Sequence, residues 1–157
     1  MSLIRKIAGL ALASLSVSAV QAADLEVTQP WVRGTVASQR ATGAFMQLNS
    51  KGGVTLVGVA SPAASVVELH EMVMDKDVMK MRPVPRLDVL PGKPLELKPG
   101  SYHVMLIDLK KPLAKGEVVP ITLTVEGQGK KVESVEVNAL VRELTAPPMM
   151  DHKHHPH

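Results

Sequence analysis

Residues 118–125, Val-Val-Pro-Ile-Thr-Leu-Thr-Val, alternate between apolar and polar side chains from residue 121 onward. Ile121, Leu123 and Val125 therefore share one face of a strand, because successive side chains point to opposite faces. Short apolar runs bounded by Gly, Pro, Asn and Asp predict further strands. These runs are Leu25–Val32, Gly43–Asn49, Thr55–Ala60, Val66–Met74, Val78–Val84, Tyr102–Leu109 and Lys131–Asn138. No window sustains a helical period, so the sequence predicts an all-β antiparallel sandwich or Greek-key barrel.

Two segments do not resemble strands. Residues 83–99 contain five prolines and are expected to cross from one part of the sandwich to another. Residues 146–157 begin with Ala-Pro-Pro and hold nothing that would pack in a core, so we expect a flexible tail that is disordered without metal. We therefore predict one domain over residues 23–145, followed by this tail.

Residues 1–22 resemble a cleavable export signal. Arg5 and Lys6 precede an apolar stretch, and Val20-Gln21-Ala22 is a suitable cleavage site, with cleavage after Ala23 as the alternative. The stretch is short for a membrane span, and no second one is long enough. Without Arg5 and Lys6 the basic residues fall from 18 to 16, against 15 acidic ones. The mature chain would then carry a net charge of about +1.

Composition excludes several classes of function. The only aromatic residues of the Trp, Tyr and Phe type are Trp31, Phe45 and Tyr102, and the basic residues are scattered, so nucleic-acid binding is not supported. The chain has no cysteine, which removes disulfides, cysteine nucleophiles and thiolate metal ligands. A blue-copper site requires a cysteine ligand and is therefore excluded.

Histidine and methionine recur together. Outside the last nine residues the histidines are His70 and His103, and each precedes a methionine by two positions, Met72 and Met105. The two members of each pair lie on the same strand face. Met81 is the third methionine of this set, eleven residues after His70. Imidazole and thioether groups are neutral, and the soft thioethers favour Cu(I) over Zn²⁺.

A hairpin around residues 74–77 would bring Met81 to His70. With Asp75 and Lys76 as the loop, Met81 lies opposite His70, with Cβ atoms about 5 Å apart. A loop over residues 75–78 places Pro83 there instead, which we consider less favourable because proline cannot donate to a ladder. The first register gives a site of His70, Met81, His103 and Met105, with Met72 and Met79 beside it as rim or reserve ligands. The simpler explanation is that the methionines fill core gaps and the histidines are hydrogen-bonded in place.

The tail carries a second metal-binding signal. Its histidines and methionines are Met149, Met150, His152, His154, His155 and His157. Histidine-rich tracts bind divalent metals, Cu²⁺ and Zn²⁺ among them, with little selectivity, and the methionines would add Cu(I) affinity. A solubilising tail or a purification remnant is the alternative.

The spacing His70, Met81, His103-x-Met105 resembles the signature of the periplasmic copper chaperones called PCuAC. The likeness includes Pro30-Trp31-Val32-Arg33 and residues 116–124, and it covers nearly the whole mature chain. It implies a cupredoxin-like β-barrel in the periplasm that binds Cu(I) through His70, Met81, His103 and Met105. It also implies copper delivery to the CuA centre of cytochrome c oxidase, often beside a Sco-type thiol protein. Ile107-Asp108 and Val125 depart from the common pattern at positions that are not ligands. A histidine-rich tail occurs in some members of the family, where it implies Cu(II) binding.

We therefore expect a copper chaperone, monomeric without metal, and not an enzyme. Four neutral ligands would saturate the metal, whereas catalysis needs an open position. One alternative is a copper storage or resistance protein without a dedicated acceptor. Another is a structural or adhesion-type sandwich with an incidental tail, which predicts no Cu(I) binding once residues 146–157 are removed.

Overall fold

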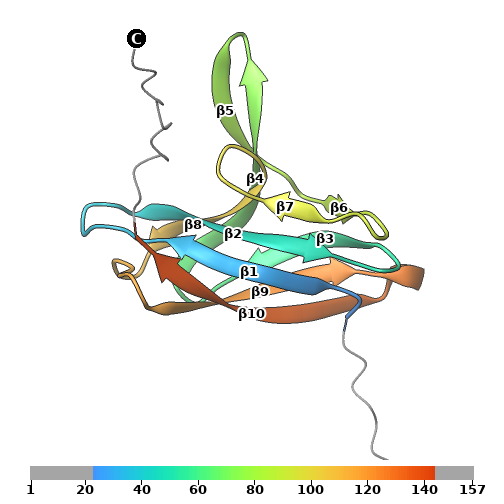
Figure 1. Ribbon diagram of the computed structural model, residues 1–157. Coiled ribbons are helices and arrows are strands. Elements are labelled where there is room, and N and C mark those ends of the chain that lie inside the picture. Colours follow the sequence, from blue (N-terminus) through green and yellow to red (C-terminus); the bar gives the residue numbers. More distant parts are fainter. Residues whose placement is uncertain (1–22, 144–157) are drawn as a thin grey trace, which may run out of the picture.

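A computed structural model describes residues 23–143 of the chain (Figure 1). This part contains ten strands and one short 3₁₀ helix, η1 (Gln128–Lys130). The strands are β1 (Glu26–Arg33), β2 (Ala41–Asn49), β3 (Val54–Ala60), β4 (Ala64–Asp75), β5 (Val78–Pro83), β6 (Leu87–Val89), β7 (Leu95–Leu97), β8 (His103–Leu109), β9 (Val118–Glu126) and β10 (Val132–Arg142). The all-β prediction is confirmed for these residues. No helix within them has the length and apolar character to span a bilayer.

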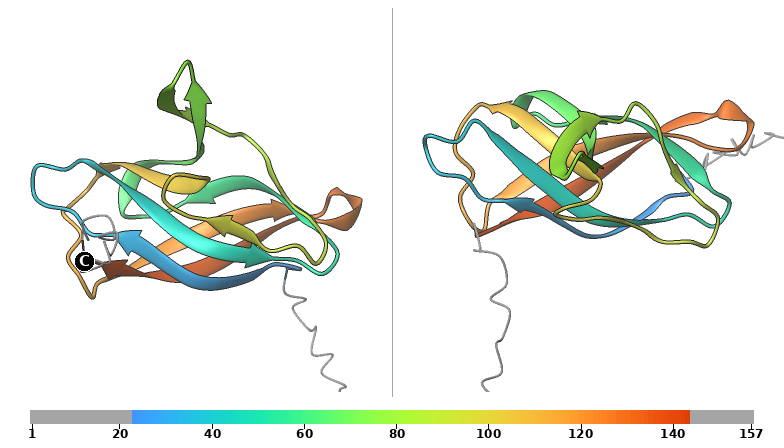
Figure 2. Two further views of the ribbon diagram at one scale, coloured as in Figure 1. Left: turned by 45° about the horizontal axis from the view of Figure 1, so that its top comes forward. Right: turned by 90° about the horizontal axis from the view of Figure 1, so that it is seen from above.

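The strands form one curled sheet in the order β5-β4-β8-β2-β1-β10-β9-β3-β6, and β7 also pairs with β2. All pairs are antiparallel except β1 with β10, which run parallel. The sheet curls until β3 lies against β4, although the two are not neighbours in the ladder. Figure 2 shows the result from two further sides, as two facing layers. The space between the layers holds one apolar core.

The alternation of β9 directs its apolar side chains into this core. Ile121 and Leu123 are 0% exposed and Val125 is 1% exposed, as their shared face predicted. Leu106 of β8 is also fully buried and joins the same core. Complete burial of a side chain of this size contributes about 1.5–3 kcal/mol. The body of the molecule is therefore stabilised by apolar packing, without cysteine cross-links.

The proline-rich segment contains two short strands, so the expectation that it does not resemble strands is wrong, whereas the expected crossing is confirmed, because these strands pair with β3 and with β2. It contains β6, which pairs with β3, and β7, which pairs with β2. Leu87, Val89 and Leu97 from these strands are buried. Strands of three residues fit between the prolines, because their few ladder bonds and one or two core side chains leave the prolines in the connections.

The last strand is longer than expected. The sequence predicts Lys131–Asn138, whereas β10 continues to Arg142. Ala139 and Val141 are buried in the core, and Leu140 pairs with Trp31 of β1. The parallel ladder with β1 thus holds the end of β10 in the sheet.

The hairpin register also differs from the favoured prediction. Asp75 pairs with Val78, and the loop is Lys76-Asp77, with φ of 49° and 63°. Positive φ at both loop residues is the condition for the tight hairpin turns that match strand twist. Pro83, not Met81, therefore lies opposite His70. Proline is tolerated there because β5 is at the edge of the sheet.

Candidate metal centre

The two interior histidines lie side by side on adjacent strands. His70 of β4 and His103 of β8 are ladder partners, and their ring centroids are 5.9 Å apart. Val104 and Leu106 point from β8 into the core, so His103 and Met105 face the other side of the sheet. The site is therefore built on the outer face of the sheet, directly behind the core.

The His103 ring is held by its Nδ1 atom, which lies 3.0 Å from the carbonyl oxygen of Ser101. A carbonyl can only accept, so Nδ1 carries the proton and the neutral ring has its lone pair on Nε2. This Nε2 lies 3.2 Å from Sδ of Met81. Burial lowers the pKa of His103 below its ordinary 6.5, the Ser101 carbonyl opposes this shift, and the charges of His70 and Arg33 add to it. His103 is therefore neutral at pH 7, with a free lone pair beside a thioether.

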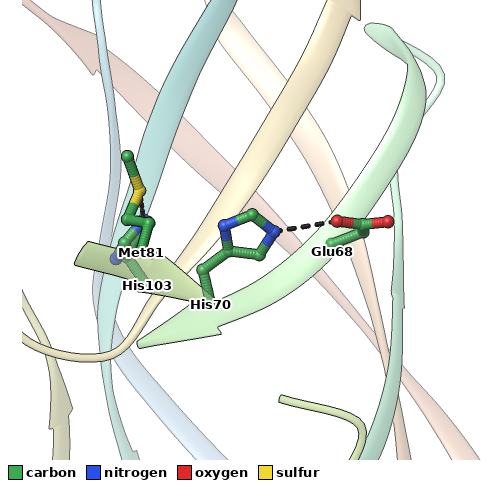
Figure 3. Close-up of polar contacts among 4 residues, drawn as sticks. All are labelled: Glu68, His70, Met81 and His103. Carbon is green, nitrogen blue, oxygen red and sulfur yellow. Dashed lines mark hydrogen bonds and ion pairs between the residues drawn. The ribbon is translucent and has the colours of Figure 1, made fainter. Parts of the chain in front are cut away.

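In the His70 ring the two nitrogens have the opposite roles. Its Nε2 lies 2.8 Å from a carboxylate oxygen of Glu68 on the same strand, so Nε2 is the protonated nitrogen. Its Nδ1 is buried and has no hydrogen-bond partner in the described part of the chain. Figure 3 shows this free nitrogen on the side of the ring where Met81 and His103 lie, away from Glu68. A buried polar atom without a partner costs about 1–3 kcal/mol, so it calls for an explanation.

Three methionines and His103 line the same cavity. Met72, Met81 and Met105 line a cavity of about 270 Å³ next to this histidine, with Phe45 on another wall. Met72 is the ladder partner of Met81, so the β4–β5 hairpin places both beside the cavity. The structure thus brings His70, Met72, Met81, His103 and Met105 together, although Met81 meets His103 where the sequence expected it opposite His70.

This donor set suits a soft monovalent ion. Among residues 23–143, no three histidine, cysteine, aspartate or glutamate side chains gather as a metal site. The converging donors are two imidazole lone pairs and thioethers, all neutral, which favour Cu(I). Bonds of about 2.0 Å to nitrogen and 2.3 Å to sulfur at a tetrahedral metal separate the donors by about 3.5 Å. The observed distance of 3.2 Å between Nε2 of His103 and Sδ of Met81 is close to this value.

Sequence reasoning missed the groups that orient the two histidines. Metal-binding histidines commonly donate their second N–H to a carboxylate or carbonyl, which fixes the ring. Glu68 and the Ser101 carbonyl have these positions here. The shared face of Glu68 and His70 was visible in their spacing, but the contact depends on rotamers that spacing does not give.

An aromatic row continues from the histidines across the sheet. The Phe45 ring centroid is 6.2 Å from that of His103 and 4.5 Å from that of Trp31. Arg33 lies over Phe45 at 5.7 Å, and Arg142 lies over Trp31 at 5.1 Å. Trp31 is half-buried on this outer face and is not part of the core, where a lone tryptophan is usually expected. These rings and guanidinium groups cover one flank of the candidate centre.

The model of the LpqE-like family, whose description is "Putative lipoprotein LpqE-like", matches residues 25–138. The chain belongs to the LpqE-like family. A lipoprotein of Leifsonia xyli subsp. xyli is 32% identical over 112 residues, which cover 71% of this chain and 68% of that protein. An uncharacterized protein of Rickettsia prowazekii is 30% identical over 121 residues, which cover 73% and 67%.

Solved structures share the fold of this LpqE-like protein. The copper-bound PCuAC domain from PmoF2 is similar with a TM-score of 0.60 at 20% identity, over 76% of this chain and 93% of that domain. Apo-DR1885 from Deinococcus radiodurans is 31% identical, with a TM-score of 0.56, over 90% and 95% of the two chains. The CuI form of DR1885 is 33% identical, with a TM-score of 0.52, over 75% and 76%. The expected cupredoxin-like fold is confirmed.

Proposed function

We propose that this LpqE-like protein is a Cu(I) chaperone that binds its ion through His70, Met81, His103 and Met105. One observation carries the proposal: each histidine is anchored through one ring nitrogen, and its other ring nitrogen lies on the side of Met81, where that of His70 is buried without a partner in the described residues. An ion between these donors would give the orphaned Nδ1 of His70 a partner. Met72 would be a reserve ligand at the rim.

The comparisons support the same ion. DR1885, 33% identical over three quarters of this chain, has a solved CuI form, and the PCuAC domain from PmoF2 with the same fold is copper-bound. We propose the same ion for this chain, held by the histidines and methionines that the fold brings together.

Release by ligand exchange follows from the chemistry of the site. His103 belongs to the packed body and is buried, whereas Met81 is 51% exposed on the hairpin. A neutral thioether at the surface is a weak ligand that an acceptor thiolate can displace, while the imidazoles still hold the ion. The acceptor would therefore replace the exposed thioether ligands first and the imidazoles afterwards, with no change in the oxidation state of the ion.

We further propose that the acceptor is the CuA centre of cytochrome c oxidase, with a Sco-type thiol protein as a second partner. The support is the resemblance of the His/Met spacing to PCuAC chaperones. Export to the periplasm by the signal over residues 1–22 belongs to the same proposal, and the lipoprotein names of the family agree with export. Those residues lie outside the described part.

The tail is proposed as an accessory site. His152, His154, His155 and His157 would bind Cu(II), and Met149 and Met150 would add Cu(I) affinity. All of them lie outside the described residues. A short tethered metal-binding segment raises the local copper concentration at the domain without requiring new contacts.

Copper transfer tests the proposal against a storage role. The Cu(I)-loaded protein is mixed anaerobically with an apo CuA domain, and the visible absorption of CuA is followed after oxidation. A chaperone restores this absorption faster than an equal concentration of Cu(I) held by a small chelator of matched affinity. If the loaded protein retains its copper, the storage or resistance function replaces the chaperone proposal.

A further inference from the structure

The β4–β5 hairpin has two unlike faces. Met72 pairs with Met81, and Met74 pairs with Met79 on the next rung of the same face. The opposite face carries ion pairs: Arg82 Nε lies 2.6 Å from a Glu71 carboxylate oxygen, and Lys80 pairs with Asp75 at 2.5 Å. Four thioethers therefore line one side of a ribbon whose other side is charged.

The two methionine rungs form a continuous series that leads to the metal centre. Directly paired side chains have Cβ atoms about 5 Å apart. Two residues of antiparallel strand span about 6.8 Å, so successive rungs are within reach of flexible methionine side chains. The inner rung, Met72 and Met81, lines the cavity beside His103. The outer rung, Met74 and Met79, lies toward the loop at the end of the hairpin, which Figure 1 shows projecting from the body.

Core packing does not account for the outer rung. Met46, a gap-filling methionine of the core, is 2% exposed, whereas Met74 is 65% exposed and Met79 is 45% exposed. A solvent-exposed ribbon with ion pairs on one face has no packing need for thioethers on the other. Two soft donors held next to each other can instead share one soft cation.

We propose that Met74 and Met79 form a second, weaker Cu(I) site, which passes the ion to Met72 and Met81 and then to the histidines. The step from the outer to the inner rung replaces Cu–S bonds by other Cu–S bonds, and the last step forms Cu–N bonds to the histidines as thioethers leave. No step needs an electron or proton. This inference rests on the proposed Cu(I) site and extends it with a route to the surface. Two neutral donors make a labile site, as a relay requires.

The first test is binding. The full chain is labelled with ¹³C in its methionine methyl groups, assigned by single Met→Leu variants, and titrated anaerobically with Ag(I), a redox-stable soft substitute for Cu(I). We expect the signals of Met81 and Met105 to shift first, and those of Met74 and Met79 to shift together at higher Ag(I), while Met46 stays unchanged. If Met81 and Met105 shift but Met74 and Met79 do not, the relay site is wrong. If none of the four shifts, the proposed copper site itself fails.

The second test is kinetic and keeps the apolar surface. The double variant Met74→Leu/Met79→Leu removes both sulfur atoms at similar volume, and Val78→Leu on the same hairpin is the matched control. We expect the double variant to keep the Cu(I) affinity of the histidine site but to take Cu(I) from a chelator about tenfold more slowly, because the tethered donors no longer raise the copper concentration beside the cavity. Val78→Leu should load at the rate of the parent protein. Equal loading rates for the double variant and the parent would overturn the relay.

Discussion

The body of the molecule and its β4–β5 hairpin differ in how deeply their side chains are buried. Val104, Leu106 and Ile121 of the body are completely buried, whereas every residue of β5 is exposed. The candidate centre lies where the two regions meet. The body supplies His103 and Met105 on β8, and the hairpin supplies Met72 and Met81. The difference suggests a division of roles: the body orients the imidazoles, and the hairpin exposes the thioethers through which an ion can arrive or leave.

The largest expected effect separates the two regions by stability. Leu106→Ala should lower the free energy of unfolding by about 3 kcal/mol, because it opens a cavity in a closely packed core. Met79→Ala on the hairpin should change it by less than about 0.5 kcal/mol, as is usual for an exposed side chain. Urea denaturation followed by circular dichroism measures both. Comparable losses in the two variants would show that the hairpin is as important for folding as the core.

The next effect concerns the group that orients His70. Glu68→Ala removes the acceptor of the Nε2 proton and should weaken Cu(I) binding about 10- to 100-fold, the usual range for such supporting groups. Glu71→Ala is the matched control on the same strand, because its carboxylate pairs with Arg82 on the charged face. Competition with a Cu(I) chelator gives the affinities. An unchanged affinity for Glu68→Ala would show that this carboxylate does not orient His70 for binding Cu(I).

A pH dependence sharpens the account of His103. Burial lowers the pKa of His103 in the folded protein below 6.5, its ordinary value. Between the two pKa values the unfolded chain binds more protons than the folded one, so stability rises with pH there. The metal-free protein should therefore lose stability as the pH falls below about 6.5, until the folded pKa is passed. In urea denaturations at pH 5.5 and 7.5, the free energy of unfolding of His103→Gln should change less between the two pH values than that of the parent protein. An equal change of the free energy of unfolding with pH in the two proteins would contradict a buried neutral ring.

The smallest effect is expected on the charged face of the hairpin. Arg82→Ala breaks the ion pair between Arg82 and Glu71. Because the Arg82 side chain is exposed to solvent, this pair contributes about 0.2–1 kcal/mol to the free energy of unfolding. We expect a small loss of stability, screened by salt, and no change in Cu(I) affinity beyond about twofold. A large loss of affinity would mean that the charged face also positions Met81. Thermal denaturation at low and high salt, with the chelator competition, measures both quantities.

The sequence predicted most of this architecture where a strand was long enough to show its period. The alternation at Ile121, Leu123 and Val125 predicted β9 correctly, and eight of the ten strands were expected near their observed positions. The three-residue strands β6 and β7 were missed, because so few residues show no period among the prolines around them.

The candidate site was predictable as a set of residues but not in its geometry. The matching His-x-Met spacing singled out His70, Met72, His103 and Met105, and the structure gathers them with Met81. The favoured hairpin register was wrong, because neither possible loop has the glycine that marks a tight turn, and the positive φ of Lys76 and Asp77 cannot be read from their identities. The contact between Glu68 and His70 depends on side-chain rotamers, which strand parity leaves open.

The most direct experiment is an anaerobic Cu(I) competition titration of the mature domain truncated after Thr145, alongside His103→Ala/Met105→Ala in the same background. Circular dichroism confirms that both proteins fold, as the outer-face positions of the two residues predict. We expect one tightly bound equivalent in the parent domain and its loss in the double variant. No competitive binding by the truncated domain, or full affinity in the double variant, would contradict a copper site built on these histidines and methionines.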